Sequence, residues 1–533
     1  MARWALVALN LLAFLLTGAT YFSFSPDTRP LPYRYFQSAF GTAITALRGI
    51  AADGTASREL VEYFQSRGAA VTNGELQAAL TMTIERPDDR TVVFESDDQG
   101  LFRFVEASFA LFGVNLSAPH KMFFLLLAVG SLVFVLTYSN EPVALLLSFC
   151  SLLAIYATVF VLFLSSQLWT AIDGRFISVL AFIPCLHLCL AAATRRWSAS
   201  AIAAVVLQCV LMAVVYQIRS SAAWSLICVV VVGCCSAGSM LVTAKSWRLA
   251  LNALVPALML IACTVSVTQW HQSRLAGQFQ TTVQSRHVIW HGLHVGLGTH
   301  PELARQYRLS LDDEPVYKNV FKYFANARDE NTLRAVFGGN GQYDYRTIRW
   351  RQYDEATRTV VIQMIRDHPR QVLEAFVYYK PLMFLRTLRW ARGVPTPPVE
   401  ALGMSPQWLT PDDERRRNDG YLRLFRPLAL ALYVVGLACY VGSSQTASAT
   451  LISFGRGAAV MGAMFLTALL PGLAVYPAFH WVADGIVAWC ALVYVAIALV
   501  IEASRPSSML HGTLWKNLFH NRVQTKHAIG FRQ

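Results

Sequence analysis

Residues 121–165 read KMFFLLLAVGSLVFVLTYSNEPVALLLSFCSLLAIYATVFVLFLS and carry formal charges only at Lys121 and Glu141. An apolar run of about twenty residues lies on either side of the short polar turn at 139–142, and a helix of that length crosses the roughly 30 Å hydrocarbon core of a bilayer. The stretch therefore predicts two adjacent transmembrane helices. We expect lipid to be the main solvent of the fold.

The composition argues against an ordinary soluble enzyme. Of the 533 residues, 55% are hydrophobic and 14% are charged, whereas roughly a quarter of the residues in a soluble domain are charged. The 45 Lys and Arg residues and 32 Asp and Glu residues give a formal charge of +13. In a membrane protein, the meaning of this excess positive charge depends on which side of the membrane the Lys and Arg residues occupy. We expect the lipid bilayer, and no nucleic acid, among the partners.

Further apolar runs of spanning length recur along the chain. They predict a mainly α, polytopic integral membrane protein with about ten transmembrane helices. The runs lie near 5–23, 121–138, 142–165, 174–194, 199–217, 223–243, 248–267, 427–444, 456–476 and 481–502.

The short loops between the runs predict the orientation, because Lys and Arg concentrate on the cytoplasmic side. One side carries Arg195, Arg196, Lys245, Arg248 and Arg456 as well as the basic tail. We expect that side to be the cytoplasmic side of a bacterial inner membrane and to hold both termini. The predicted order is a transmembrane anchor at 1–23, a periplasmic loop domain at 24–120, six transmembrane helices within 121–267, a helical periplasmic domain at 268–426, three transmembrane helices within 427–502 and a cytoplasmic tail at 503–533.

Two patterns stand out in the first polar segment. Alternating residues from Leu80 to Glu85, a turn at 87–89 and a return from Thr91 to Phe94 predict a small β-hairpin. The apolar residues between Leu101 and Phe112 recur at helical spacing and predict an amphipathic helix on the membrane surface. In the second polar segment, periodic stretches predict helices near 286–296, 312–326, 343–367 and 370–390.

The cysteines do not suggest a disulfide framework or a cysteine zinc site. All ten lie in the apolar runs, and none lies in the two polar segments. Free cysteine packs as a small apolar residue, so we expect packing to be the role of Cys185, Cys189 and the pair Cys234 and Cys235.

The most informative polar stretch is Val93-Phe94-Glu95-Ser96-Asp97-Asp98-Gln99-Gly100. Adjacent carboxylates just before a membrane-surface helix can accept a proton from a hydroxyl, or can hold a divalent cation or a sugar. The same residues also suit an ordinary turn. The pair by itself leaves both interpretations open.

The surroundings of this pair resemble those in the GT-C class of membrane glycosyltransferases, and most of all the glycosyltransferase family 39 type. The matching residues are Val93-Phe94, Asp97-Asp98, Gly100 and Pro119-His120-Lys121, within a layout of one span, a long outer segment and many further spans. The resemblance implies that Asp97, or its neighbour Asp98, is the catalytic base. It also implies a donor sugar linked to polyprenyl phosphate and chemistry on the outer face of the membrane.

A second group of polar residues lies between Arg286 and Gly298. His287, His291 and His294 are separated by four and three positions, so they share one face of a helix. Three imidazoles on one face can bind a transition metal, can contact a phosphate when protonated, or can belong to a structural helix at an interface. The pattern His-Glu-x-x-His is absent, and the identity of any metal stays open.

Four cations are candidates for binding a lipid-linked phosphate. Arg175, Arg219, Arg286 and Lys380 lie in or near outer segments, where Arg or Lys can stabilise a leaving phosphate. The alternative is that each one merely extends its charge from the membrane edge into water.

The resemblance, together with these features, implies a glycosyltransferase that would move a sugar from a polyprenyl-phosphate donor to a lipid, glycan or protein acceptor at the periplasmic face. No cofactor is required by the pattern, although the acidic pair leaves room for a divalent cation. One alternative is a transferase of the O-antigen ligase or polymerase type, which works through Arg and His. Another alternative is a membrane scaffold or transporter. Transporters usually keep ionisable residues within their spans, and here only His187 and Asp484 are of that kind, which makes a transporter less favourable.

Overall fold

The structure is a computed structural model of the whole chain. It describes residues 2–23, 28–30, 34–49, 56–66, 70–84, 90–92, 100–164, 176–194, 197–273, 289–311, 313–338, 343, 348–391, 426–444, 452–475 and 479–504.

Long apolar helices dominate the described part of the chain. Nine helical stretches in it are long and apolar enough to cross a membrane, and a tenth, within α21, is shorter. The helices concerned are α1 (Ala2–Ser23), α6 (Ala118–Thr137), α7 (Pro142–Leu164), the 3₁₀ turn η2 (Phe176–Ala181) with α8 (Phe182–Thr194), α9 (Ala199–Ile218), η3 (Ser220–Ala222) with α10 (Ala223–Thr243), α11 (Trp247–Ser273), α21 (Arg426–Ser444), α22 (Phe454–Ala468) with α23 (Leu470–Ala474), and α24 (Phe479–Ala503). The predicted mainly α polytopic membrane fold is confirmed.

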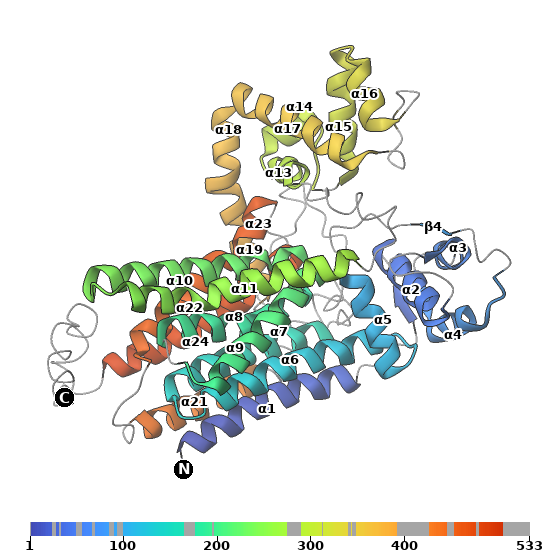
Figure 1. Ribbon diagram of the computed structural model, residues 1–533. Coiled ribbons are helices and arrows are strands. Elements are labelled where there is room, and N and C mark those ends of the chain that lie inside the picture. The colour runs from blue at the N-terminus through green and yellow to red at the C-terminus, as the bar shows by residue number, and fades with distance from the viewer. Residues whose placement is uncertain are drawn as a thin grey trace.

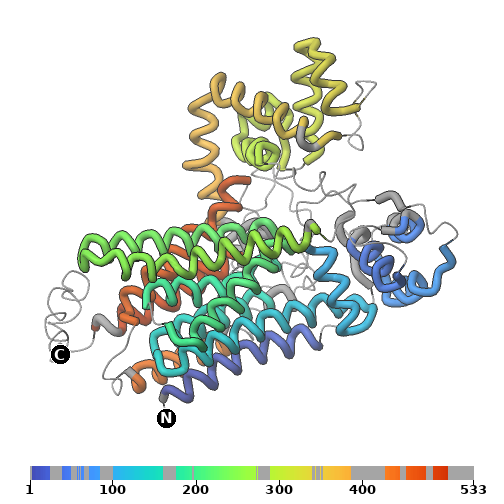
Figure 2. Tube along the Cα trace, viewed as in Figure 1, coloured from blue at the N-terminus to red at the C-terminus, as the bar shows by residue number. Residues whose placement is uncertain are grey.

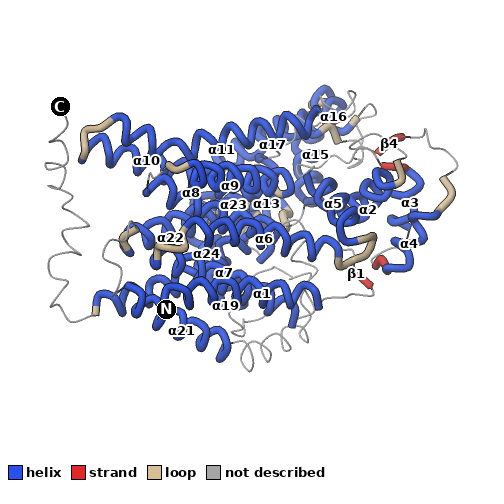
Figure 3. Tube along the Cα trace, turned by 60° about the horizontal axis from the view of Figure 1, so that its bottom comes forward, coloured by secondary structure: helices blue, strands red, loops and turns tan. Residues whose placement is uncertain are grey.

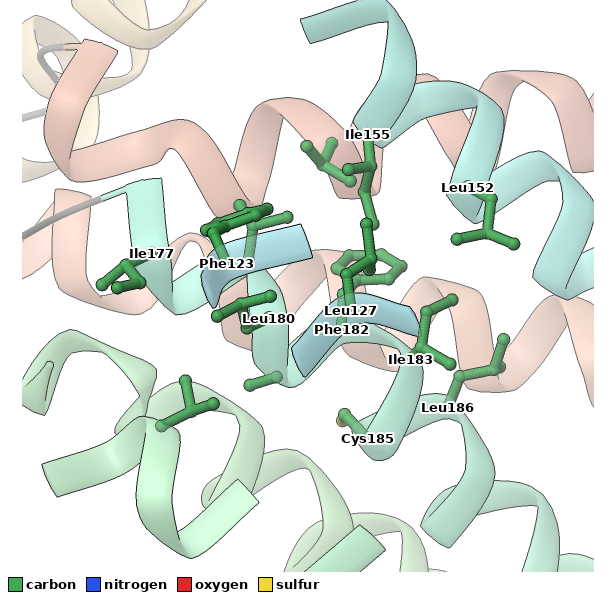
Figure 4. Close-up of a cluster of buried hydrophobic side chains, with 14 of the residues drawn as sticks. Phe123, Leu127, Leu152, Ile155, Ile177, Leu180, Phe182, Ile183, Cys185 and Leu186 are labelled. Carbon is green, nitrogen blue, oxygen red and sulfur yellow. The ribbon is translucent and has the colours of Figure 1, made fainter. Parts of the chain in front are cut away.

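These helices lie side by side in one bundle (Figure 1). Helix α7 and the η2–α8 pair are almost wholly buried, whereas α10 and α11 expose much of their apolar surface. The buried centre is close-packed aliphatic and aromatic side chains from α6, α7, η2 and α8 (Figure 4). Because lipid tails are as apolar as these side chains, polar contacts help to fix the helix pairs. Asn10 on α1 donates to the Leu145 carbonyl of α7 at 3.0 Å, and Gln208 on α9 donates to the Gly130 carbonyl of α6 at 2.8 Å.

The two ends of the bundle differ. The start of α1 and the end of α24 lie at the same end, and the small helices of the first polar segment lie at the opposite end (Figures 1 and 3). The second polar segment stands beside that opposite end and overhangs one side of the bundle (Figure 2). We call the end with the polar segments the domain end.

The first polar segment forms a group of short helices and strands whose aromatic side chains belong to the same apolar core as the bundle. Phe40 stacks on Phe109 with ring centroids 5.6 Å apart and meets Phe64 edge to face at 6.2 Å. Its elements are β1 (Thr28–Pro30), α2 (Arg34–Leu47), β2 (Ala56–Ser57), α3 (Arg58–Ser66), β3 (Ala70–Thr72), α4 (Asn73–Thr81), β4 (Arg90–Val92) and α5 (Gly100–Phe112). The short strands form two antiparallel pairs, β1 with β3 and β2 with β4.

The predicted β-hairpin is wrong in its first strand and in its pairing. Leu80 and Thr81 belong to α4, which a reciprocal capping box between Thr72 and Glu75 initiates and the helix-forming Ala-Ala-Leu run extends. The strand expected to return from the turn is present as β4, but it pairs with β2, far earlier in the chain. The turn at 87–89 lies outside the described residues. The helix predicted from Leu101 to Phe112 is present as α5, but its apolar residues Leu101, Phe104, Val105 and Phe109 are buried within the protein, where α5 packs on α2, α6 and α9.

The second polar segment is helical, as its periodicity predicts, and has a separate apolar core centred on Val320, Val336 and Tyr353. We call its described part, within residues 289–391, the second domain. Its elements are α13 (Ile289–Leu297), α14 (Pro301–Tyr307), α15 (Asp313–Asn326), α16 (Glu330–Phe337), α17 (Trp350–Asp367), α18 (Pro369–Glu374), the π turn η5 (Ala375–Tyr379) and α19 (Lys380–Ala391).

Candidate functional site

The start of α5 packs directly on the end of α9. Gly100, the first residue of α5, lies so close to the backbone there that an added Cβ would be 2.7 Å from the Ile218 nitrogen and closer still to the Gln217 carbonyl. Any side chain at position 100 would overlap backbone, which cannot move aside as a side chain can. Glycine at this position is therefore what allows α5 to begin at the end of α9.

Arg219 is the next residue along α9 and forms its C-cap. Its backbone N–H donates to the Val215 carbonyl at 2.8 Å, and its side chain is half-buried. A cation at this position is stabilised by the partial negative charge of the helix C-terminus. One residue before Ile218, the Gln217 amide donates to the Thr268 hydroxyl at 2.6 Å and ties α9 to α11. The predicted cation Arg219 is thus held at the domain end, beside the first turn of α5.

Five predicted site residues, Asp97, Asp98, Arg175, Arg286 and His287, lie outside the described residues. The acidic pair precedes Gly100 directly in the chain, and Arg175 directly precedes Phe176 of η2. Gly100, which follows the acidic pair, is therefore in contact with Gln217 and Ile218, which precede Arg219. For Arg286 and His287, the nearest described residue in the sequence is Ile289.

Aromatic rings line the domain end around η2. Phe176 stacks on Phe123 of α6 at 6.0 Å, and Phe123 meets Tyr21 of α1 at 5.1 Å. His120, which belongs to the matching Pro-His-Lys run, packs against the Tyr21 ring at 5.8 Å and is fully buried. Tyr21 is fully buried as well. The ends of α1, α6 and η2 are thereby joined where the polar segments begin.

A buried carboxyl group contacts η2 two residues after Phe176. Asp484 of α24 is 4% exposed, and its Oδ2 accepts a hydrogen bond from the Ser178 hydroxyl of η2 at 2.5 Å. An ionisable residue inside a spanning segment is costly and is often functional. Asp484 was recognisable in the sequence as one of two ionisable exceptions in the spans, but nothing in the sequence indicated Ser178, which lies 306 positions earlier.

The two described histidines of the predicted face belong to the interior of the second domain. The His291 ring lies between Tyr353, whose hydroxyl is 2.8 Å from Nδ1, and Asp313, whose Oδ1 is 3.1 Å from Nε2. His294 is fully buried, and burial, followed by the neighbouring His291, lowers its pKa to about 3. This geometry favours the structural alternative for His291 and His294 over metal binding or contact with a phosphate.

The start of α13 explains why the helix lies in this core. The Asp354 carboxylate of α17 accepts the backbone N–H of Trp290 at 3.2 Å, which satisfies one of the unpaired N–H groups of the first turn. Burial raises the pKa of Asp354 above its ordinary value despite the hydrogen bonds it accepts. The helix is thus capped by a distant carboxylate, which the sequence of α13 does not reveal.

Lys380 is buried at the junction of the second domain and the bundle. Its ammonium donates to the carbonyls of Leu473 and Ala474 at 2.8 and 3.1 Å, and lies 3.6 Å from the centre of the Phe376 ring. Burial lowers its pKa to about 7. These contacts favour a structural role for Lys380 over the predicted phosphate-binding role, because two of its donors are used by the end of α23.

Three cysteines converge in the bundle. The sulfur atoms of Cys185, Cys189 and Cys228 lie within 4.8 Å of one another, and those of Cys189 and Cys228 are 3.9 Å apart. The spacing would suit a metal that prefers sulfur. Metal binding requires thiolates, however, and their charge is expensive among apolar side chains. The sequence predicts that Cys185 and Cys189 pack as small apolar residues, and all three thiols are buried in the core of the bundle.

The described residues thus bring together the start of α5, Arg219, the aromatic rings around Phe176 and the Ser178–Asp484 pair at the domain end. They do not bring His291, His294 or Lys380 to that place. Comparison of the chain with protein-family models, with curated proteins and with solved structures finds no match.

Proposed function

We propose that the protein is a membrane glycosyltransferase that moves a sugar from a polyprenyl-phosphate donor to an acceptor hydroxyl at the domain end of the bundle, on the periplasmic face of a bacterial inner membrane. The observation that carries the proposal is the contact of Gly100 with the end of α9 beside Arg219. Asp98 precedes Gly100 by two residues, so chain connectivity limits the distance between their Cα atoms to about 7 Å. A base and a cation would then lie near the same helix end.

The chemistry requires both groups. Asp97 or Asp98 removes the proton of the acceptor hydroxyl, whose oxygen attacks the anomeric carbon of the sugar with inversion. The bond from that carbon to the phosphate oxygen breaks, and the lipid phosphate leaves as an anion. Arg219, and Arg175 next to η2, stabilise that anion. A divalent cation held by the acidic pair would add to the same stabilisation.

The location suits reactants of opposite solubility. A polyprenyl chain dissolves in the bilayer, whereas its phosphate and sugar stay at the polar surface, and an acceptor hydroxyl arrives from water or from the membrane surface. We take that boundary to lie where the ends of α1, α6, η2 and α9 come together. The ligase-type alternative depends on histidine, and His291 and His294 are enclosed in the second domain, which makes that alternative less favourable.

The test is sugar transfer by the full-length protein in vesicles, with a polyprenyl-phosphate-linked sugar as donor. The double variant Asp97→Asn, Asp98→Asn keeps the size of both side chains and removes their basicity, so transfer should fall at least ~10²-fold while donor binding remains. The matched control is Asp412→Asn, Asp413→Asn, another adjacent pair, which should transfer normally. Near-normal transfer by the first variant would exclude the acidic base and favour the ligase-type alternative.

A second variant tests the contact itself. Gly100→Ala places a methyl group against the backbone of Gln217 and Ile218, so it should shift the start of α5 and reduce transfer while most of the bundle stays folded. Gly462→Ala on α22, where an added Cβ meets no atom within 4 Å, should have wild-type activity and equal or greater thermal stability. Wild-type transfer by Gly100→Ala would show that this contact does not position the site.

A further inference from the structure

A long helix leaves the second domain and runs across the side of the bundle. It consists of α18, η5 and α19, and continues without a break from Pro369 to Ala391. Its first half, labelled α18 in Figure 1, runs across the direction of the spanning helices. In that view it runs at a steep angle to α10 and α11, so it does not continue the bundle as a further spanning helix.

One side of this helix exposes large apolar residues. The exposed fractions of Leu373, Val377, Tyr378 and Leu385 are 62%, 68%, 59% and 57%. A π turn holds more residues per turn than an α-helix, so η5 keeps Val377 nearly in line with Leu373, four positions earlier. The result is an apolar stripe along the helix, which we call the 373–385 stripe.

The opposite side of the helix is fixed to the bundle. Lys380 donates to the carbonyls at the end of α23, and Phe384 packs against Phe465 of α22 at 6.4 Å and against Ile486 of α24. The 373–385 stripe therefore faces away from the protein while its helix is held in place.

The stripe is continuous with the lipid-facing surface of the bundle. Phe465 and Leu469, which pack with Phe384, adjoin Leu466 and Leu470, and these two are 66% and 43% exposed on α22 and α23. Exposed leucines on a spanning helix are covered by lipid tails. The apolar surface that begins on these helices continues onto the crossing helix.

We propose that residues 369–391 form an interfacial helix that buries the 373–385 stripe among the lipids of the leaflet at the domain end. An amphipathic helix of this kind lies roughly 5–10 Å deep, at the border of head groups and tails. Tyr378 suits that border because its ring is apolar and its hydroxyl reaches water. The helix anchors the second domain to the membrane beside α22–α24, and this role does not depend on the reaction that the protein catalyses.

Photocrosslinking in a bilayer tests the proposal. The full-length protein, carrying benzoylphenylalanine in place of Val377 or Leu385, is placed in vesicles of phosphatidylethanolamine and phosphatidylglycerol, irradiated, digested and analysed by mass spectrometry for lipid adducts. Two reference positions are Leu258, 57% exposed on the spanning helix α11, and Thr359, exposed on α17 of the second domain. Positions 377 and 385 should give adduct yields like that of 258, about tenfold above that of 359.

Yields at 377 and 385 no higher than at 359 would overturn the proposal. Adducts with a second copy of the chain in place of lipid would also overturn it, because the stripe would then be a protein interface. If the probe at 377 prevents folding, the exposed Leu373, one turn earlier, takes its place. Loss or retention of sugar transfer does not affect this readout, so the anchor and the proposed reaction are tested separately.

Discussion

At the residue scale, the fate of His294 shows what burial does to a titratable group. The ring is enclosed in the second domain, where the effect of burial outweighs that of the Asn319 side chain, which favours the charged form. Charging an imidazole in such a place is costly, and burial therefore lowers the pKa of His294 to about 3. The side chain is neutral at pH 7 and acts as a packing residue.

The stability of the second domain should accordingly fall in acid. Below pH 6.5 the unfolded chain protonates this histidine, whereas the folded domain does not until about pH 3, so the loss develops between these two values. At pH 5 it should reach about 2 kcal/mol. Pulse proteolysis of the full-length protein at pH 7 and pH 5 measures the change. His294→Leu should lose this part of the pH dependence, and an unchanged dependence in that variant would assign it to other groups.

At the element scale, α13, α19 and α23 form a joint between the second domain and the bundle. Lys380 of α19 donates to the last carbonyls of α23. Gly296 of α13 lies against the same place, where an added Cβ would be 2.7 Å from the Lys380 Nζ and 2.9 Å from the Val475 carbonyl carbon. Three elements from distant parts of the chain therefore depend on a close backbone approach at Gly296.

Gly296→Ala should loosen this joint. The added methyl group meets the Val475 backbone, so we expect a cost of about 1–3 kcal/mol, typical of overpacking. Hydrogen exchange should accelerate in α13 and α23 and remain unchanged in the buried helix α7. Gly292→Ala, one turn earlier on α13, meets only the end of the Val475 side chain at 3.2 Å and is the matched control. Equal exchange in the two variants would argue against the joint.

At the scale of the whole molecule, the bundle separates two surfaces. Ten helices, counting the shorter α21, return the described chain to the end where it starts, and the polar segments gather at the other end (Figure 1). The excess of Arg and Lys in the loops 195–196 and 245–248 favours the cytoplasm for the end opposite the domains. The reacting groups proposed above would then work outside the cytoplasm.

Cysteine labelling checks this orientation. Cysteines introduced at Ala78 of α4 and Thr359 of α17, both exposed, should react with a membrane-impermeant maleimide in spheroplasts. A cysteine at Lys245, in the loop between α10 and α11, should react only after permeabilisation. Labelling of position 245 from outside, with protection of 78 and 359, would reverse the assigned sides and place the proposed reaction in the cytoplasm.

The sequence by itself determined the membrane fold. Nine of the ten predicted spans coincide with described helical stretches that are long and apolar enough to cross a membrane, and the tenth coincides with the shorter α21. The reason is that spanning length and apolar composition are local properties, dictated by the thickness and chemistry of the bilayer. The same holds for α5, whose apolar spacing within Leu101–Phe112 was visible, and for the helices of the second domain.

Only the tertiary structure decided which distant residues meet. Three contacts join segments that carry no common local signal. They are the pairing of β4 with β2, the packing of Gly100 against the end of α9, and the hydrogen bond from Ser178 to Asp484. The helical spacing of His291 and His294 predicted a shared face, but it did not reveal what covers that face. Packing against Tyr353 and Asp313 made it an interior, because burial depends on neighbours from elsewhere in the chain, whereas periodicity depends only on the helix itself.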